Sequence, residues 1–406
     1  MRRHPFVCLS LFALAALAHA ATPAPDQSDE IAALRAEVAE LRAMVETLQA
    51  SIAPQSPPGQ AAVTTVEPPP PAPAPPPVAA ASPTSNYFNP SISMIGNFLA
   101  VGGHNPIENR PAADLRESEL GLSAVVDPYA RGDFFLSYGE EGVEVEEGFI
   151  SFNRLPWDLL SKVGRMRASF GTINTLHLHT LPWPDSPIST VNLLGGEEGW
   201  VSTGVSVAKI IPLPADVFSE LTVQVFRGDS EGLFTTSDRS DLAYNGHYRV
   251  FKDLSDATNL DLGLSYGQGP NGVEPNSQTR LTGLNGTLRW KPLRTAQYLA
   301  VTTRGEWIRS RREQLGGTET ADGGFLSAEY QFARRWSAGA RIEASDRADD
   351  ASLDDDGQAL LLTFSPSEFS QLRGELRRRD YAEGTTAYEF LMQLQFAIGA
   401  HGAHPF

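Results

Sequence analysis

The sequence has almost no cysteine and, beyond its N-terminus, no long hydrophobic run. Cys8 is the single cysteine among 406 residues, which excludes disulfide stapling and zinc sites built from several thiolates. The mean hydropathy of −0.22 and the lack of further apolar runs exclude a membrane protein built from helices. Positive charge is scarce as well: 32 Lys and Arg stand against 49 Asp and Glu, so nucleic acid is not expected as a partner.

The one strongly apolar run belongs to a targeting segment. Arg2 and Arg3 precede the apolar residues 7–17, and Ala18-His19-Ala20 has the small-x-small pattern of a cleavage site. This order predicts a secretory signal peptide over residues 1–20, which is too short for a membrane-spanning helix. Cys8 lies inside that segment, so catalysis by a thiol is excluded too.

Two further segments precede the main part of the chain. Residues 26–53 carry apolar side chains at spacings of three and four, which predicts a short α-helical coiled coil; they are Ile31, Leu34, Val38, Leu41, Val45, Leu48 and Ile52. The proline-rich residues 54–85 predict an extended, semi-rigid linker. A coiled coil on such a stalk is expected to bind copies of itself or another partner, and its few heptads leave two or three helices open.

The remaining residues, 86–406, consist of short segments of alternating polarity. In the last of them Tyr388, Phe390 and Met392 share one side, while Glu389 and Gln393 share the other. Successive side chains of a strand point to opposite faces, so this alternation suits a wall with lipid outside and water inside. About sixteen such segments are present, an even number within the range of bacterial barrels. The predicted fold class is all-β, a single antiparallel transmembrane β-barrel over residues 86–406.

The connections between these segments also alternate in length. Short turns such as Asp127-Pro128 are typical of the periplasmic rim, and longer polar connections are typical of the outer rim. The expected outer loops include 102–112, 173–199, 229–240, 268–278, 311–323 and 346–356. Aromatic residues near strand ends, among them Tyr129, Trp200, Trp336 and Tyr381, are expected to form girdles at the two membrane interfaces.

Charged side chains recur on the water-facing side of the predicted strands. These candidate pore-lining residues are Glu117, Glu119, Arg131, Asp133, Arg165, Arg167, Arg249, Arg289, Arg304, Glu306, Arg341, Glu343, Arg373, Glu375 and Arg377. In a water-filled lumen they would set the electric field. About half of them are instead expected to pair across neighbouring strands and brace the wall. The arginines favour anions, but the loops are acidic, so the charge preference stays open.

The longest expected loop, 173–199, carries the most distinctive polar residues. It contains His177, His179, Asp185, Glu197 and Glu198. In an extended chain, a spacing of two places both imidazoles on one side, and imidazole with carboxylate suits zinc or a related divalent metal. Ordinary pore lining is the alternative interpretation. Signatures of serine hydrolases, phosphate-binding loops and metalloproteases are absent from the sequence, so neither enzymatic activity nor a cofactor is expected.

The order of signal peptide, coiled coil, proline-rich stalk and barrel resembles outer-membrane porins of the phosphate-selective porin O/P type. The stretches 119–131, 142–148, 176–183 and 400–406 are similar to a group of bacterial outer-membrane proteins, some of them labelled zinc-regulated TonB-dependent receptors. The resemblance implies a trimer in the outer membrane of a Gram-negative bacterium, with the coiled coil in the periplasm and loop 173–199 as the constriction. TonB-dependent receptors, however, need about 22 strands and a plug, and residues 21–85 provide no plug.

The expected function is therefore a porin-like channel for passive diffusion of small hydrophilic or anionic solutes. Its partners would be outer-membrane lipid and further copies of the chain. Two alternatives stay open. One is a structural tether whose periplasmic coiled coil binds the cell wall or another protein. The other is a metal-uptake receptor.

Overall fold

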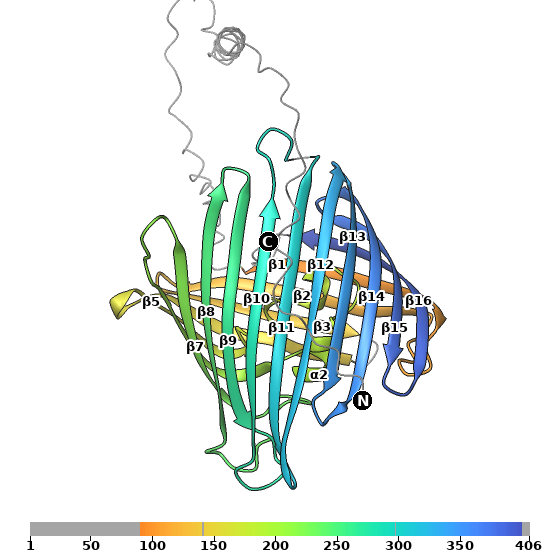
Figure 1. Ribbon diagram of the computed structural model, residues 1–406. Coiled ribbons are helices and arrows are strands. Elements are labelled where there is room, and N and C mark those ends of the chain that lie inside the picture. Colours follow the sequence, from red (N-terminus) through yellow and green to blue (C-terminus); the bar gives the residue numbers. More distant parts are fainter. Residues whose placement is uncertain (1–89, 140–141, 297, 400–406) are drawn as a thin grey trace, which may run out of the picture. The chain divides into compact units, whose positions relative to one another are not determined.

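The computed structural model describes residues 90–139, 142–296 and 298–399, which form a closed antiparallel barrel of sixteen strands (Figure 1). The predicted signal peptide, coiled coil and proline-rich linker lie outside the described residues. The strands are β1 Ser91–His104, β2 Ala113–Asp127, β3 Ala130–Gly139, β4 Gly142–Leu155, β5 Leu159–Arg167, β6 Val201–Ile210, β7 Phe218–Arg227, β8 Leu242–Ser255, β9 Thr258–Pro270, β10 Gln278–Trp290, β11 Ala300–Gln314, β12 Gly317–Ala333, β13 Trp336–Arg347, β14 Asp350–Ser367, β15 Ser370–Tyr381 and β16 Thr385–Gly399.

Every strand pairs with its neighbours in the sequence, and β1 closes the barrel against β16. For the described residues, an all-antiparallel β-barrel and the predicted number of strands are thus confirmed. The register also follows the predicted faces: in β16, Tyr388, Phe390 and Met392 are exposed on the outside, whereas Leu391 and Gln393 are buried inside. No helix among the described residues is long and apolar enough to cross a membrane.

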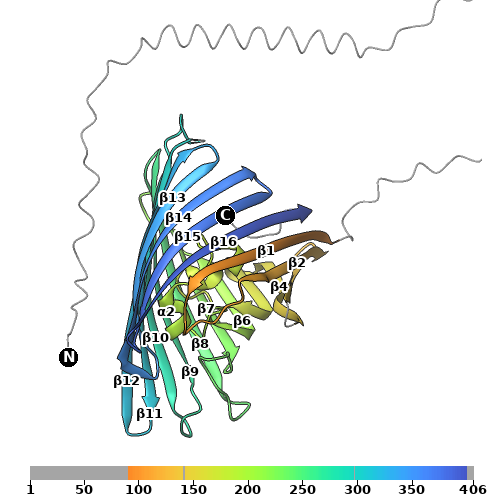
Figure 2. The same ribbon diagram turned by 90° about the vertical axis from the view of Figure 1, so that its right-hand side faces the viewer.

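The wall of the barrel is uneven in height. The strands β5, β6 and β7 have 9, 10 and 10 residues, about the 9–11 that cross a bilayer. The strands β11, β12 and β14 have 15, 17 and 18 residues and are therefore long enough to extend past it. Figures 1 and 2 show these long strands standing opposite the strongly tilted β1–β4.

Two of the predicted outer loops are wrong. Residues 311–323 and 346–356 continue the strand pairs β11–β12 and β13–β14, and only residues 315–316 and 348–349 form turns. Thr320 pairs with Arg311 in the first hairpin, and Asp355 pairs with Ser345 in the second. Polar residues form strands here because both faces of a strand that extends beyond the membrane can contact water.

Exposed aromatic residues gather at strand ends, as a girdle requires. Tyr129 and Trp336 lie at the rim where the short turns were expected, and both are exposed. Trp200 and Tyr381 were wrongly assigned to the girdle, since both are buried inside the barrel. Trp200 precedes β6, where the chain returns from the interior, and its ring packs against Phe234 at 5.0 Å between centroids.

A hydrophobic core fills part of the barrel interior. Loop side chains such as Phe170, Leu194 and Phe234 pack there against inward-facing Leu281 and Ile308 of the wall. A second cluster joins loop residues Leu178, Leu181 and Trp183 to Phe325, Ala359 and Leu361 of β12 and β14. Burial of this apolar surface holds the connection between β5 and β6 inside the barrel.

Candidate functional site

The connection between β5 and β6, residues 168–200, folds into the barrel and forms the candidate site. It contains three short helices, η2 Ile173–Thr175, η3 Leu178–Thr180 and α2 Ile188–Leu193. Figure 2 shows α2 inside the ring of strands, where it contacts β11–β14. The predicted constriction loop, 173–199, is the greater part of this segment, which is called the inner loop below.

Glu306 of β11 anchors the start of the inner loop. Its buried carboxylate accepts hydrogen bonds from the backbone N–H groups of Thr172 at 2.8 Å and Ile173 at 3.3 Å. The N–H of Gly171 donates to the hydroxyl of Ser265 at 2.9 Å. Gly171 has a φ of +62°, a conformation that glycine adopts without a steric penalty. Side chains of β9 and β11 thus accept the backbone hydrogen bonds that water would accept in a loop at the protein surface.

Asp185 anchors the tip of the inner loop to strands farther along the wall. Its carboxylate accepts hydrogen bonds from Arg341 at 2.7 Å, Arg377 at 2.9 Å and Arg379 at 2.7 Å, all buried. Burial alone would raise the pKa of Asp185, but the three guanidinium groups outweigh it and lower that pKa. Arg341 also stacks on the ring of Trp183 at 4.8 Å. This network fixes the loop tip to β13 and β15.

The first outer loop, residues 105–112, joins the same arginine cluster. Glu108 forms ion pairs with Arg377 at 2.9 Å and with Arg379, and it accepts a hydrogen bond from Tyr381 at 3.0 Å. Burial opposes ionisation of Glu108, but Arg379, Arg377 and Arg110 lower its pKa to about 2. Two loops of the same rim therefore meet on one set of wall arginines.

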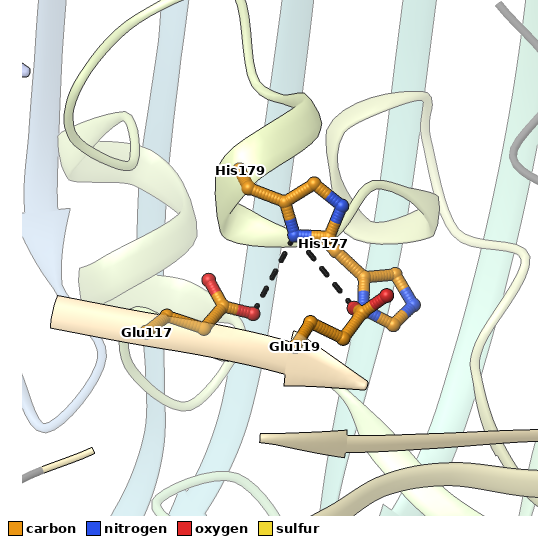
Figure 3. A group of neighbouring side chains, drawn as sticks. All are labelled: Glu117, Glu119, His177 and His179. Carbon is orange, nitrogen blue, oxygen red and sulfur yellow. Dashed lines mark ion pairs between the residues drawn. The ribbon is translucent and has the colours of Figure 1, made fainter. Parts of the chain in front are cut away.

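The two histidines of the inner loop lie against β2 and β4, together with a group of carboxylates. Figure 3 shows His177 and His179 above Glu117 and Glu119 of β2. One ligand atom from each of these four buried side chains lies within 4.8 Å of the others. The Nδ1 atom of His179 is 3.6 Å from both Glu117 and Glu119. The rings of His177 and His179 are 5.6 Å apart.

His177 has further partners on β4. Its Nδ1 atom lies 2.7 Å from Glu119 and 2.6 Å from Glu146, and its Nε2 atom lies 2.8 Å from Glu147. Glu146 and Glu147 are adjacent yet both turn inward, because the β3–β4 register shifts between Phe135 and Leu136. Such a bulge places two successive side chains on one side of a strand.

The two imidazoles differ in their affinity for protons. Burial lowers the pKa of His177, but hydrogen bonds with Glu119, Glu146 and Glu147 outweigh it and hold the pKa well above its usual value. Burial lowers the pKa of His179 to about 4, against the opposing charge of Glu119. His179 is therefore neutral at ordinary pH, with a ring nitrogen that can act as a metal ligand.

The structure places most of the predicted pore-lining residues inside the barrel. The buried ones are Glu117, Glu119, Asp133, Arg167, Glu306, Arg341, Glu343, Arg373, Glu375 and Arg377, and the partly exposed ones that face the interior are Arg131, Arg249, Arg289 and Arg304. Most of the buried candidate residues contact the inner loop, or residues beside it, rather than open solvent. The other loop residues differ in burial: Glu197 is partly exposed and Glu198 is exposed.

Arg165 is the exception, and its prediction was wrong. The register pairs it with Gly148 and Thr203 and places it on the same face as the exposed Val163. It therefore faces the outside of the barrel, where its guanidinium donates to the carbonyl of Val145 at 2.9 Å. The polarity of β5 does not alternate cleanly, since Lys162 lies on the inward face, so counting by twos from the sequence gave the wrong side.

Many inward charges form pairs along the wall. Arg131 pairs with Asp133 at 2.9 Å, Arg249 with Asp261 at 2.5 Å, and Arg304 with Glu329 at 3.4 Å. Three of the partly exposed arginines are thus matched by a carboxylate on the same or the adjacent strand. The expectation that such residues brace the wall agrees with this geometry.

Sequence reasoning found the two histidines and missed several charged residues of the site. Arg116, at a bulge of β2, pairs with Glu197 at 2.7 Å. Arg379 was missed too, although it continues the inward parity of Arg373 and Arg377. Glu146 and Glu147 lie in the stretch 142–148 but were not named as candidate site residues. Strict alternation assigns adjacent residues to opposite faces of a strand, so it cannot predict a bulge that turns both carboxylates inward.

Solved structures of similar fold include outer-membrane porins. The anion-selective porin of Comamonas acidovorans has a TM-score of 0.54 at 14% identity, covering 76% of this chain and 100% of that porin. OprB of Pseudomonas putida also has a TM-score of 0.54, at 10% identity, covering 76% and 94%. At such low identity the likeness concerns the fold, which is thus a porin-type barrel.

The sequence comparisons give a family relationship. No model of a known protein family matches the chain. An uncharacterized protein of Aquifex aeolicus (strain VF5) is 31% identical over 344 residues, which cover 75% of this chain and 72% of that protein. The chain therefore belongs to the same family as this Aquifex aeolicus protein.

Proposed function

We propose that the protein is an outer-membrane channel of porin type, through which small hydrophilic or anionic solutes diffuse passively. The observation that carries this proposal is the inner loop, which enters the barrel and is held there by inward-facing side chains of several strands. A barrel of sixteen strands is wide enough for an aqueous lumen. A loop anchored inside it would set the narrowest cross-section.

Charge pairing favours a weak preference for anions. The partly exposed Arg131, Arg249 and Arg304 face the lumen, but each is matched by a nearby carboxylate. Asp185 and Glu108 likewise neutralise part of the arginine cluster. Selection by size, through the inner loop, is therefore expected to outweigh selection by charge. That the solutes include phosphate is a prediction from the resemblance to the porin O/P type.

The proposed location is the outer membrane of a Gram-negative bacterium, and the proposed assembly is a trimer. Exposed apolar side chains such as Phe134, Leu262 and Phe390 on the outer face of the barrel support contact with lipid. The low wall around β5 and β6 is where a neighbouring copy could cover the barrel. OmpT, an outer membrane protein of Vibrio cholerae with a similar fold, also occurs in a trimer form.

The two alternatives receive less support. A TonB-dependent metal receptor would need about 22 strands, whereas this barrel closes with sixteen. The tether depends on residues 26–53, which lie outside the described residues. The channel is therefore the function that the described geometry supports best.

Conductance in planar bilayers tests the proposal. The purified protein should produce discrete current steps in potassium chloride, and a salt gradient should give a small reversal potential of the sign expected for anions. Liposome swelling with sugars of increasing size should then give a size limit. Folded protein that inserts into bilayers and conducts no better than the detergent control would overturn the proposal.

A further inference from the structure

We propose that Glu117, Glu119, His177 and His179 bind one divalent transition-metal ion of the zinc class, which staples the inner loop to β2. The four side chains come from two segments about 60 residues apart in the chain, and all four are buried. Two imidazoles and two carboxylates form a ligand set that zinc takes in proteins. The proposal concerns binding, and binding does not require that the channel function be correct.

The distances suit a tetrahedral ion. With metal–ligand bonds of 2.0–2.1 Å, neighbouring ligand atoms in a tetrahedron lie about 3.3 Å apart. The Nδ1 atom of His179 is 3.6 Å from an oxygen of Glu117 and 3.6 Å from an oxygen of Glu119, and all four ligand atoms lie within 4.8 Å of one another. Small side-chain shifts are enough to bring them to bonding distance.

A supporting hydrogen bond is already in place behind His177. Metal-bound histidines almost always donate their other ring N–H to a carboxylate or carbonyl, which fixes the tautomer. The Nε2 atom of His177 lies 2.8 Å from Glu147, and the other oxygen of Glu147 accepts the backbone N–H of Arg167 at 2.7 Å. The Nδ1 atom of His177 therefore points to Glu119 and Glu146, on the side of the proposed ion.

Glu117 is a second, independent indication of a ligand. Its carboxylate is buried against that of Glu146, with which it shares a hydrogen bond, and among the described residues neither oxygen accepts a hydrogen bond from an N–H donor. A buried carboxylate needs a compensating charge or donor. Arg167 contacts nearby Glu146 at 3.5 Å but pairs more closely with Glu198 at 2.8 Å. The carboxylates of Glu117, Glu119, Glu146 and Glu147 therefore outnumber the one imidazolium of His177, and a divalent cation that displaces the proton from its Nδ1 atom would offset the excess negative charge.

The ligand types also set the metal class. Imidazole nitrogens favour zinc, copper, nickel or iron, whereas magnesium and calcium favour ligand sets of oxygen alone. A carboxylate-rich site with two imidazoles should therefore retain zinc in the presence of excess magnesium. The expected spectroscopic signature is a shell of nitrogen and oxygen at about 2.0–2.2 Å without sulfur.

The test is a zinc titration by calorimetry on the purified full-length protein, without a histidine tag. One zinc ion should bind per chain and survive excess magnesium. His179→Ala and the isosteric Glu119→Gln should weaken binding by at least about 100-fold, and Glu147→Gln by the smaller 10- to 100-fold typical of a supporting carboxylate. His104→Ala, at an exposed histidine at the end of β1, should leave binding unchanged.

Heat-modifiable migration in gels would confirm that each variant keeps its barrel. Absence of saturable zinc binding by the folded protein overturns the proposal. So does binding that persists in both His179→Ala and Glu119→Gln, or that disappears in His104→Ala. If zinc binds as expected and the bilayer experiment shows no conductance, the site stands and the channel function fails.

Discussion

Replacing Asp185 by alanine should release the tip of the inner loop from the barrel wall. Asp185 is fully buried and holds three buried arginines, Arg341, Arg377 and Arg379, at 2.7–2.9 Å. Removing one partner of a buried charge pair costs about 3–5 kcal/mol, because it leaves the opposite charge uncompensated. A difference of about 1.4 kcal/mol corresponds to a factor of ten, so the equilibrium constant for docking of the loop should fall by about 100- to 3000-fold.

Single-channel recording is the most direct assay of this change. A released loop no longer narrows the lumen, so Asp185→Ala should show larger and less uniform current steps than the wild type. Hydrogen exchange should accelerate at the backbone of Ile188, which donates to Glu343 at 2.9 Å next to the arginine cluster. Asp349→Asn is a suitable control, since it removes an exposed carboxylate at the turn between β13 and β14.

The reasoning fails under a specific outcome. If Asp185→Ala forms a heat-modifiable barrel, conducts in the same steps as Asp349→Asn and keeps slow exchange at Ile188, the carboxylate does not hold the loop. The hydrophobic contacts of Trp183 with Phe325, 5.2 Å apart between ring centroids, would then be sufficient for docking. A double variant with Trp183→Ala would test that explanation.

Three further predictions follow from other contacts. Trp200→Ala, in the apolar core inside the barrel, should lower the free energy of unfolding by about 3–5 kcal/mol, measured by urea titration; an unchanged midpoint would contradict that role. Glu306→Ala leaves the N–H groups of Thr172 and Ile173 without their acceptor and should cost about 1–3 kcal/mol for each, seen as faster exchange there and not in β16. Because the pKa of Glu108 is lowered to about 2 from 4.5, its contribution to loop docking should be complete above about pH 4.5 and lost as the pH falls towards 2; exchange of residues 105–112 that does not change over this range would refute it.

The strand pattern could be predicted because the solvent differs on the two sides of the wall. Tyr388, Phe390 and Met392 face the outside while Glu389 and Gln393 face the interior, so the polarity of the sequence alternates from one residue to the next. The strand number follows from counting such segments. The outer hairpins could not be predicted in the same way, because beyond the membrane both faces meet water and polarity no longer distinguishes a strand from a loop.

The candidate site could be predicted only in part, for a related reason. His177 and His179 stand out because two histidines two residues apart are rare in so acidic a chain. Their carboxylate partners come from β2 and β4, and the folding of the inner loop onto these strands, rather than sequence proximity, brings them together. The bulge at Glu146 breaks period two, and a local break in register is decided by packing that a single sequence does not contain. In β5 the register is unbroken, but polar residues lie on both faces, so polarity alone gave the wrong side for Arg165.

The inner loop changes the meaning of the charged ladder. A bare barrel of sixteen strands would expose its inward charges to water, and their sum would set the selectivity. Here Arg341 and Arg377 bind Asp185, Glu306 binds the backbone of Thr172, and carboxylates of β2 and β4 surround His177. These anchors come from different sides of the wall, so each opposes a different displacement of the loop. Charges that a bare lumen would present to solutes therefore hold the inner loop in place, and under the proposed channel function substitutions among them should alter the width of the channel before they alter its charge preference.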